Sequence, residues 1–280
     1  MTTIGVVALP QLAPERLRSV AEAADEVGLD ELWLWEDCFL AGGIATASAV
    51  LAWTNRLKVG VGLLPVPLRN VALTAMELSA LHRLFPGRAT IGVGHGVLDW
   101  MGQVGARAES PMTLLSEYVA ALRQLLAGSR VTVDGRYVHL DGVALDLPPT
   151  APTEILVGAV GPRTMRLAGA EADGVILTGG TTPEQVRAAR QIIGTGRLVV
   201  YLHTATGRDA AERTERERVR WGYPTVEDRM VIGDASEVAD QVRRWADAGA
   251  DTVVLQPTPD DPDPEGFVRL AQEVQQHRVQ

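Results

Sequence analysis

The sequence predicts an α/β protein with the (β/α)8 (TIM) barrel fold, and three observations point to it. Eight short apolar runs rich in β-branched residues recur along the 280 residues and alternate with windows of helical periodicity. The runs are apolar at both odd and even positions, as strands buried on both faces should be. A helical window follows the eighth run, which favours a closed barrel over an open doubly wound sheet. We therefore expect a single domain over residues 1–280.

Each expected strand is a compact apolar run bounded by polar residues, glycine or proline. The eight are Ile4–Leu9, Glu31–Trp35, Leu57–Leu63, Ala89–Val93, Glu154–Ala159, Gly174–Thr178, Leu198–His203 and Thr252–Gln256. Between the first two, Leu17, Val20 and Ala24 share one face of a helix. Thr182–Gln185 reads Thr-Pro-Glu-Gln, a capping box with proline at the first helical position. These signals support the alternation of strands and helices.

Two connections are longer than a barrel helix requires. After strand four come Val97–Gly128 and then Val131–Leu140, where Asp-Gly between two alternating runs predicts a β-hairpin. After strand seven comes Thr204–Asp234, rich in Arg and Glu, for which we expect a solvated helix followed by a loop. Connections that follow barrel strands lie on the catalytic face. Both insertions are therefore candidates for lids or for a dimer surface.

The composition argues against several classes of partner. The formal net charge is −9 and there is no run of Lys and Arg, so binding to nucleic acid or to an anionic membrane is not expected. Cys38 is the only cysteine, which excludes an internal disulfide framework and fits a reducing cytosol. The first apolar run follows no basic residue and stops at Pro10, so it is interpreted as a strand and not as a signal peptide. No apolar run reaches membrane-spanning length, and we expect a soluble cytoplasmic protein.

Common catalytic motifs are missing from the sequence. It has no GxxxxGK[ST], GxSxG or HExxH, which argues against P-loop chemistry, an α/β-hydrolase nucleophile and a zinc protease. Gly92–Gly96 reads Gly-Val-Gly-His-Gly, which is not the dinucleotide-binding GxGxxG. The five histidines lack metal-ligand spacing, so we expect no metal site.

Glycine-rich segments end four of the expected strands. They are Lys58–Pro67, Arg88–Val97, Ile155–Pro162 and Val175–Gly180. Glycine lets the backbone approach a ligand closely or adopt positive φ. Ordinary strand-to-helix turns would explain any one segment, but four of them indicate a single flat or phosphate-bearing ligand held by main chain. Pro162 opens a helix after one segment, where free N–H groups are suited to bind an anion.

Five segments, in order along the chain, also resemble one known family. They are Gly28–Asp37, Leu57–Pro65, Leu84–Gly94, Val157–Leu177 and Val231–Asp251. Together these segments resemble the luciferase-like monooxygenases, which are (β/α)8-barrel oxidoreductases that use FMN or the deazaflavin coenzyme F420. The resemblance implies the same fold. It also implies hydride transfer or monooxygenation of a small organic substrate that depends on one of these cofactors.

The resemblance further implies which residues hold the cofactor. Gly62–Leu63 falls where the family often has a non-prolyl cis peptide beneath the isoalloxazine ring. Gly158, Gly161, Gly179 and Gly180 fall where members of the family bind the cofactor phosphate. The full set of expected cofactor-binding residues is Gly62, Leu63, Leu64, Gly94, Gly96, Gly158, Ala159, Gly161, Pro162, Gly179 and Gly180.

Proton transfer is expected to involve Asp37 and His95. Where F420-dependent members of the family often have Asp-His, this chain has Asp37-Cys38, so the proton-donating imidazole of the family is missing there. His95, in the loop after the fourth strand, is the nearest substitute in the sequence, and Asp37 is expected to contact the cofactor or the substrate. We expect the substrate between the cofactor ring and the segments Val97–Ala108 and Thr204–Asp228.

The resemblance leaves the cofactor and the chemistry open. No strongly basic cluster is evident for the polyglutamate tail of F420, although Arg69, Arg163 and Arg166 could contribute. The choice between F420 and FMN is therefore close, and we favour F420. The alternatives are a two-component FMN monooxygenase, a non-catalytic flavin-binding barrel, and a hydrolase or aldolase that uses Glu36 and Asp37. An ion pair at the barrel top is the preferred role for Glu36. Members of the family are often dimers, which implies a homodimer.

Overall fold

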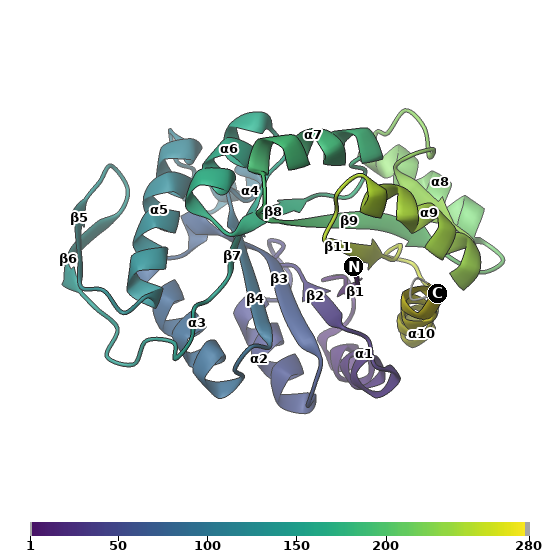
Figure 1. The fold of residues 1–280 in the computed structure, drawn as a ribbon, viewed down its shortest axis with the longest axis horizontal. Helices are drawn as coiled ribbons and strands as arrows, with labels where there is room; N and C mark the ends of the chain where they lie inside the picture. The colour runs from purple at the N-terminus through teal and green to yellow at the C-terminus, as the bar shows by residue number, and fades with distance from the viewer. Residues whose placement is uncertain (1, 278–280) are drawn as a thin grey trace.

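The computed structural model describes residues 2–277 and shows eight parallel strands closed into a barrel (Figure 1). The strands pair in the order β9-β11-β1-β2-β3-β4-β7-β8, and a β8–β9 pairing closes the ring. The barrel strands are β1 (Thr3–Ala8), β2 (Glu31–Leu34), β3 (Lys58–Pro65), β4 (Ala89–Gly94), β7 (Ile155–Gly158), β8 (Gly174–Leu177), β9 (Arg197–Ala205) and β11 (Thr252–Gln256). The predicted (β/α)8 fold is therefore confirmed.

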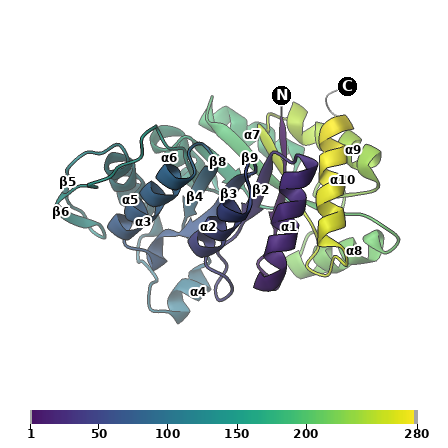
Figure 2. The same cartoon turned by 90° about the horizontal axis from the view of Figure 1, so that it is seen from below.

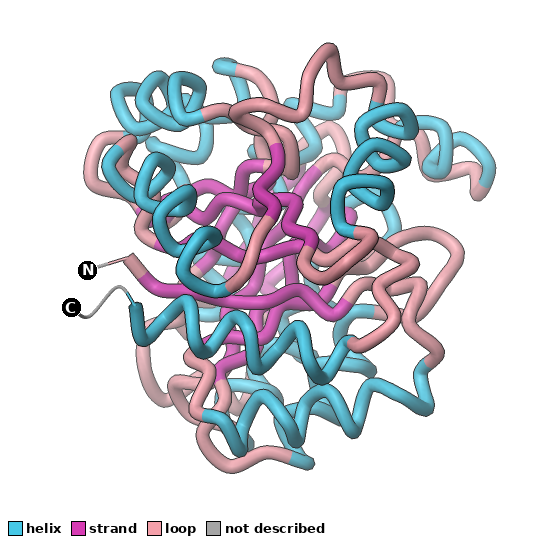
Figure 3. Tube along the Cα trace, turned by 90° about the vertical axis from the view of Figure 1, so that its right-hand side faces the viewer, coloured by secondary structure: helices cyan, strands magenta, loops and turns pink. Residues whose placement is uncertain are grey.

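Helices surround the strands, which gather at the centre of the molecule (Figure 3). The helices of the outer ring are α1 (Pro14–Val27), α2 (Gly43–Trp53), α3 (Val71–Leu84), α5 (Pro111–Leu126), α6 (Pro162–Glu171), α7 (Pro183–Ile193), α9 (Ala235–Asp247) and α10 (Pro264–His277). The capping box predicted at Thr182 begins α7, and Gly28 ends α1 with φ of 86°. No helix within residues 2–277 combines the length and apolar character needed to cross a membrane.

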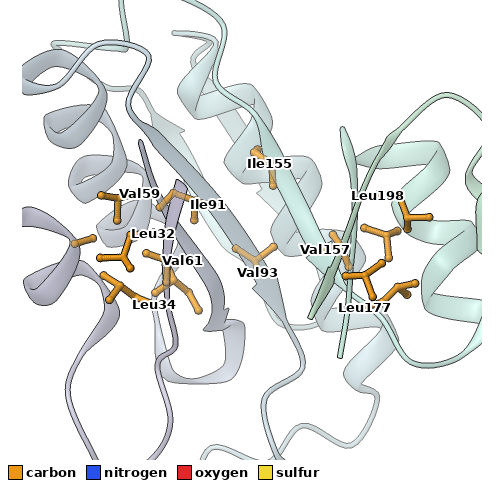
Figure 4. Packing of buried hydrophobic residues seen from close by; sticks show 14 of the residues in the cluster. Leu32, Leu34, Val59, Val61, Ile91, Val93, Ile155, Val157, Leu177 and Leu198 are labelled. Atoms are coloured by element: carbon orange, nitrogen blue, oxygen red, sulfur yellow. The ribbon is translucent and has the colours of Figure 1, made fainter. Parts of the chain in front are cut away.

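Two layers of apolar side chains explain why the strands are apolar at both parities. An outer layer between strands and helices includes Val61, Val93 and Val157 (Figure 4). An inner layer fills the barrel and includes Val199 and Tyr201 of β9. The alternate residues Leu198, Val200 and Leu202 belong to the outer layer, beneath the helices. The inward positions of β9 are therefore the odd-numbered ones.

A buried charge network lies where the barrel strands begin. The guanidinium of Arg197 bridges Glu31 (Nη2 to Oε1, 2.6 Å) and Glu154 (Nη1 to Oε2, 2.8 Å). The indole Nε1 of Trp33 donates to the other oxygen of Glu31 at 3.0 Å. Residues at this end of a (β/α)8 barrel serve stability, and ligand sites lie at the opposite end.

Both predicted insertions are present, but they do not lie wholly on the catalytic face. A short helix α4 (Leu98–Gln103) follows β4, and α8 (Ala210–Trp221) follows β9, then a short strand β10 (Met230–Ile232). Figure 2 shows α4 and α8 on the side opposite the N-terminus. The predicted hairpin forms as β5 (Val131–Asp134) and β6 (His139–Val143).

The hairpin differs in position from the expectation. It lies outside α5, away from the barrel axis (Figure 1). The carboxylate of Glu117 on α5 accepts the backbone N–H groups of Arg136, Tyr137 and Val138, which holds the hairpin turn against the helix. Because the hairpin follows α5 and not β4, it does not cover the barrel mouth, and only the α4 part of this insertion remains a candidate lid.

The first and last helices of the chain pack against each other. Figure 2 shows α1 and α10 side by side. Glu265 in the first turn of α10 accepts from Arg16 of α1 (Nη2 to Oε1, 2.8 Å) and from Ser19 (2.7 Å). These contacts fix the helices that flank β1, beside the β11–β1 pair.

Candidate active site

The peptide bond between Gly62 and Leu63 is cis, at the position that the resemblance implies. The register of β3 against β4 shifts between Val61 and Leu64 at this point. The chain thereby turns the side chain of Leu63 across the inner faces of the neighbouring strands. The side chain of Leu64 is buried on the opposite face, in the outer layer beneath the helices, so only its main chain is available to a ligand.

Two of the expected cofactor-binding glycines are also required by packing within the protein. A Cβ atom added to Gly94 or Gly158 would overlap the side chain of Leu63. Gly96 has φ of 68°, and a Cβ there would lie 2.9 Å from Cβ of Pro65. Gly94 and Gly158 thus allow Leu63 to form the floor of the barrel mouth.

Aromatic side chains complete this floor. The hydroxyl of Tyr201 donates to the carbonyl oxygen of Gly62 at 3.3 Å. The rings of Trp33 and Trp35 meet the Tyr201 ring edge-on, with centroids 6.0 and 5.2 Å away. Burial raises the pKa of Tyr201 well above its usual value, so this hydroxyl stays protonated. The floor is therefore uncharged and largely aromatic.

The N-terminus of α6 opens beside the floor without a side-chain cap. Gly161 is the N-cap residue with φ of −109°, and no atom lies within 4 Å of the position that its Cβ would occupy. Pro162 takes the first helical position, so the next N–H groups of α6 point out of the helix end. The N–H of Ala159 is not available, because it donates to the carbonyl of Ile176 at 3.0 Å.

The Gly179–Gly180 turn lies opposite and is held through its carbonyl groups. The hydroxyl of Tyr223 donates to the Gly179 carbonyl at 2.8 Å, and Nη1 of Arg229 donates to the Gly180 carbonyl at 2.5 Å. Gly180 has φ of 79°, and a Cβ there would overlap the Tyr223 ring. Glycine is required at this position for both reasons.

A cavity of about 410 Å³ lies between the start of α6 and this turn. Its lining includes Ala159, Pro162, Gly179, Gly180 and Arg229. The cavity combines an uncapped helix N-terminus, a glycine turn and a guanidinium that pairs with no carboxylate within residues 2–277. These features favour an anionic group of a ligand.

His95 lies to one side of the barrel axis. Its Nε2 is 3.3 Å from Oγ1 of Thr164 in α6. Burial lowers the pKa of His95, opposed in part by the carbonyl of Pro111, so the ring is neutral near pH 7. The inward-facing positions of β4 are Gly92 and Gly94. His95 is at an odd-numbered position, so it does not continue this inward-facing row.

Asp37 and Glu36 have different environments after β2. Burial raises the pKa of Asp37, and the positive charge of Arg220 on α8 partly opposes this shift. No hydrogen bond within residues 2–277 joins Asp37 directly to His95. The carboxylate of Glu36 instead forms a two-point ion pair with Arg69 (Nη2 to Oε2, 2.6 Å), as predicted.

Sequence reasoning missed three residues at the mouth. His203 on β9 and Gln256 on β11 are paired in register, one position beyond the inner-layer pair Tyr201 and Val254. Each is 3% exposed, and neither His203 Nδ1 nor Gln256 Oε1 has a hydrogen-bond partner within residues 2–277. Tyr223, after α8, is the third. The odd-numbered residues of β9 face the inside of the barrel, and this alternation was the signal that could have identified His203.

These observations define the class of the protein. It is a (β/α)8 barrel with a candidate ligand site at the carboxyl ends of its strands, where the Leu63 floor, the cavity beside α6 and buried polar atoms without partners in residues 2–277 lie. Its family is shown by sequence: the model of the luciferase-like monooxygenase family matches residues 2–223, and the chain belongs to this family.

Two curated proteins are similar to this chain in sequence. A 5,10-methylenetetrahydromethanopterin reductase of Methanolobus tindarius is 30% identical over 190 residues, which are 68% of this chain and 58% of the relative. An F420-dependent glucose-6-phosphate dehydrogenase of Nakamurella multipartita is 33% identical over 193 residues, 62% of this chain and 55% of the relative. The chain thus spans little more than half the length of these curated relatives.

Solved structures agree with the fold along the whole chain. The coenzyme F420-dependent tetrahydromethanopterin reductase of Methanopyrus kandleri superposes with a TM-score of 0.84 at 21% identity, covering 99% of both chains. An F420-dependent secondary alcohol dehydrogenase bound to an F420–acetone adduct gives 0.85 at 20% identity, covering 98% of both. At these identities the likeness establishes the (β/α)8 fold and no more.

Proposed function

We propose that the protein is an oxidoreductase that binds coenzyme F420 at the carboxyl end of its barrel and acts on a small organic molecule by hydride transfer. One observation carries the proposal: the floor formed by Leu63 and the cavity suited to an anion lie at the same end of the barrel. The named relatives are F420-dependent or methanopterin-linked enzymes, which supports the same cofactor.

The residues present fit such a cofactor. The free N–H groups at the start of α6, the Gly179–Gly180 turn and Arg229 would hold a phosphate. Leu63, above Gly94 and Gly158, would support the ring system. Bound F420 would supply hydride chemistry, and the protein would contribute binding, orientation and electrostatics.

The acidic tail of F420 requires cations near the same rim. Arg163 and Arg166 lie on the exposed face of α6, and neither forms an ion pair within residues 2–277. Arg69 is excluded from this role because Glu36 and Glu77 both bind it, at 2.6 and 2.7 Å. Two of the three arginines considered from the sequence therefore support the choice of F420 over FMN.

The other readings have less support. A hydrolase or aldolase would need Glu36 as a free carboxylate, but its side chain is 10% exposed and its oxygens accept from Arg69 and from the N–H of Gly43. A non-catalytic flavin-binding barrel would not need unpartnered polar atoms beyond the cofactor rim, and His203 and Gln256 provide them. Asp37 and His95 stay proposed proton-handling residues.

Equilibrium titration of the purified protein tests this proposal. F420 fluorescence and FMN fluorescence are each followed against protein concentration under the same conditions. We expect saturable binding of F420 and weaker binding of FMN. Binding of FMN with none for F420 would replace the cofactor assignment by the FMN alternative, and binding of neither would refute the proposed site.

We also propose that two copies of the chain associate through the outward face of α3. Leu73, Met76 and Leu84 are 48, 61 and 71% exposed and share one side of this helix. Helices normally bury such a stripe. Sedimentation velocity checks this proposal, with a dimer as the expected species and a monomer at all concentrations as the contrary result. The cytoplasmic location and the lack of nucleic-acid binding stay predictions.

A further inference from the structure

A short hydrogen-bond chain fixes the protonation of His203. Tyr223 has one hydroxyl proton, and it donates this proton to the carbonyl of Gly179 at 2.8 Å. The same oxygen lies 3.4 Å from Nε2 of His203, so it can only accept there. His203 therefore carries its proton on Nε2, and Nδ1 presents a bare lone pair.

That lone pair is buried and unused by the protein. His203 is 3% exposed, and no atom within residues 2–277 donates to Nδ1. Burial, and then the charge of Arg220, lowers the pKa of His203 to about 4, so the ring is neutral near pH 7. A buried acceptor without a donor is rare in folded proteins and destabilises the structure that contains it. A donor from a ligand would remove this destabilisation.

Gln256 places a second acceptor beside the first. Its Cα is the register partner of the His203 Cα on the neighbouring strand, and its Oε1 is buried without a partner. A Cβ added at Gly179 would lie 2.6 Å from His203 Nε2 and 2.9 Å from Gln256 Oε1, so both side chains reach the same point of the rim, with Oε1 on the Nε2 side of the ring and not on the Nδ1 side. Glycine at position 179 leaves that point free.

The walls around the two acceptors are aromatic. The rings of Trp221 and Tyr223 lie with centroids 5.9 and 5.8 Å from that of His203, and Tyr201 is the next inward residue below it. Arg220 is the cation nearby, and Glu217 pairs with it (3.3 Å). Two lone-pair acceptors between aromatic rings favour neutral hydroxyl groups, one for each acceptor, and repel a phosphate or carboxylate.

We propose that His203 Nδ1 and Gln256 Oε1 are specificity-determining acceptors for separate donor groups of an uncharged, hydroxyl-bearing substrate, and that Tyr223 is a positioning residue that fixes the imidazole tautomer. The inference deepens the proposed function, on which it rests for turnover. The tautomer of His203 and the acceptor at Nδ1 belong to the protein alone, so both can be measured without the cofactor.

Selective ¹⁵N labelling of histidine tests the tautomer first. In the wild-type protein near neutral pH, the His203 resonances should show a protonated Nε2 and an unprotonated Nδ1. Tyr223→Phe removes the hydroxyl and should leave a mixture of the two tautomers. A protonated Nδ1 in the wild type would overturn the proposal.

Matched ligands then test the specificity. Cyclohexanol and cyclohexyl phosphate share one ring and differ in the head group, and each is titrated while the His203 Nδ1 resonance is followed. We expect cyclohexanol to move this resonance and cyclohexyl phosphate to leave it unchanged. The opposite order, or no response to cyclohexanol, would show that Nδ1 does not accept a hydroxyl.

Two substitutions at the same position separate binding from structure. Asparagine carries its polar atoms near the level of Nδ1, whereas glutamine reaches the level of Nε2. His203→Gln should weaken alcohol binding roughly tenfold while keeping the contact with Tyr223, and His203→Asn should retain most of the affinity. Both variants should bind F420 as the wild type does. Equal alcohol affinity in all three proteins would refute the role of His203. If the wild-type protein did not bind F420, only the proposed function would be refuted.

Discussion

Single glycines at the barrel mouth serve two different purposes, and the structure separates them. At Gly94 and Gly158 an added side chain would overlap Leu63, so these glycines are needed for packing whether or not a ligand binds. At Gly161 an added Cβ meets no atom within 4 Å, and the backbone angles suit any residue. The openness at Gly161 is thus the residue-scale feature that a ligand would explain.

Replacing Gly161 tests that explanation. Gly161→Val would fill the space before the free N–H groups of α6, and we expect cofactor affinity to fall about tenfold or more. Stability should fall by less than about 1 kcal/mol, because only the N-cap preference changes. Gly161→Asp should weaken cofactor binding at least as much without lowering stability, because its carboxylate would cap the helix itself. F420 titration and chemical denaturation measure the two effects.

A change at the other end of the same helix provides the control. Ala170 is exposed, lies in the last turn of α6 and does not line the cavity. Ala170→Val introduces the same side chain and should leave the cofactor affinity unchanged. Equal affinities of Gly161→Val and Ala170→Val would place the phosphate elsewhere.

Individual residues were predicted from the sequence when a local pattern or the resemblance carried the signal. The cis bond at Gly62–Leu63 and the ion pair of Glu36 are of this kind. His203 was missed because its importance depends on Tyr223 and Gln256, which are distant in sequence and meet it only in the closed barrel. The sequence of one strand does not reveal contacts with residues that are this far away along the chain.

At the scale of elements, α8 is held to the barrel by a buried arginine. Arg213 is 2% exposed and binds Asp261 (Nη1 to Oδ2, 2.7 Å) and Thr258 (2.8 Å) in the loop after β11. Its remaining carboxylate contact, Asp209, is 53% exposed. The same helix carries Arg220 and Trp221 to the mouth, so this clamp fixes part of the proposed substrate wall.

Two adjacent aspartates allow the clamp to be tested with a matched control. Asp261→Ala leaves the guanidinium of Arg213 buried and short of one partner, and we expect a loss of about 3 kcal/mol of unfolding free energy. Asp260 instead pairs with Arg216 on the surface, both being about half exposed. Asp260→Ala should cost less than about 1 kcal/mol.

Denaturant unfolding compares the two variants. Similar losses of unfolding free energy for Asp260→Ala and Asp261→Ala would mean that the buried ion pair stabilises the protein no more than the exposed pair does. A larger loss for Asp261→Ala, as we expect, would show that this helix depends on the contact with the loop after β11.

The elements themselves were largely predictable, since hydrophobic periodicity and capping signals are local. All eight barrel strands and the capping box at Thr182 were found from the sequence. The hairpin at Val131–Val143 was also found, but its place outside α5 was not, because the contacts of Glu117 with its turn join residues 19 to 21 positions apart. Position requires tertiary contacts that periodicity does not encode.

For the whole molecule, closure of the sheet is what brings the site together. Gly62, Gly161, Gly180 and His203 lie on strands or loops far apart along the chain, and all follow or end strands that point to one rim. The charge network of Arg197 with Glu31 and Glu154 occupies the other end. The sequence could predict that the glycine segments share a rim, since all parallel strands of a barrel end there. It could not predict which side chains meet across it.

A crystal structure of the protein soaked with F420 tests the central claim most directly. The account predicts the cofactor phosphate at the start of α6, within hydrogen-bonding distance of main-chain N–H groups after Gly161, with the deazaflavin ring against the Gly62–Leu63 peptide and His203 left free on the substrate side. Cofactor bound at the end of the barrel where Arg197 lies, or a ring distant from Gly62–Leu63, would contradict it.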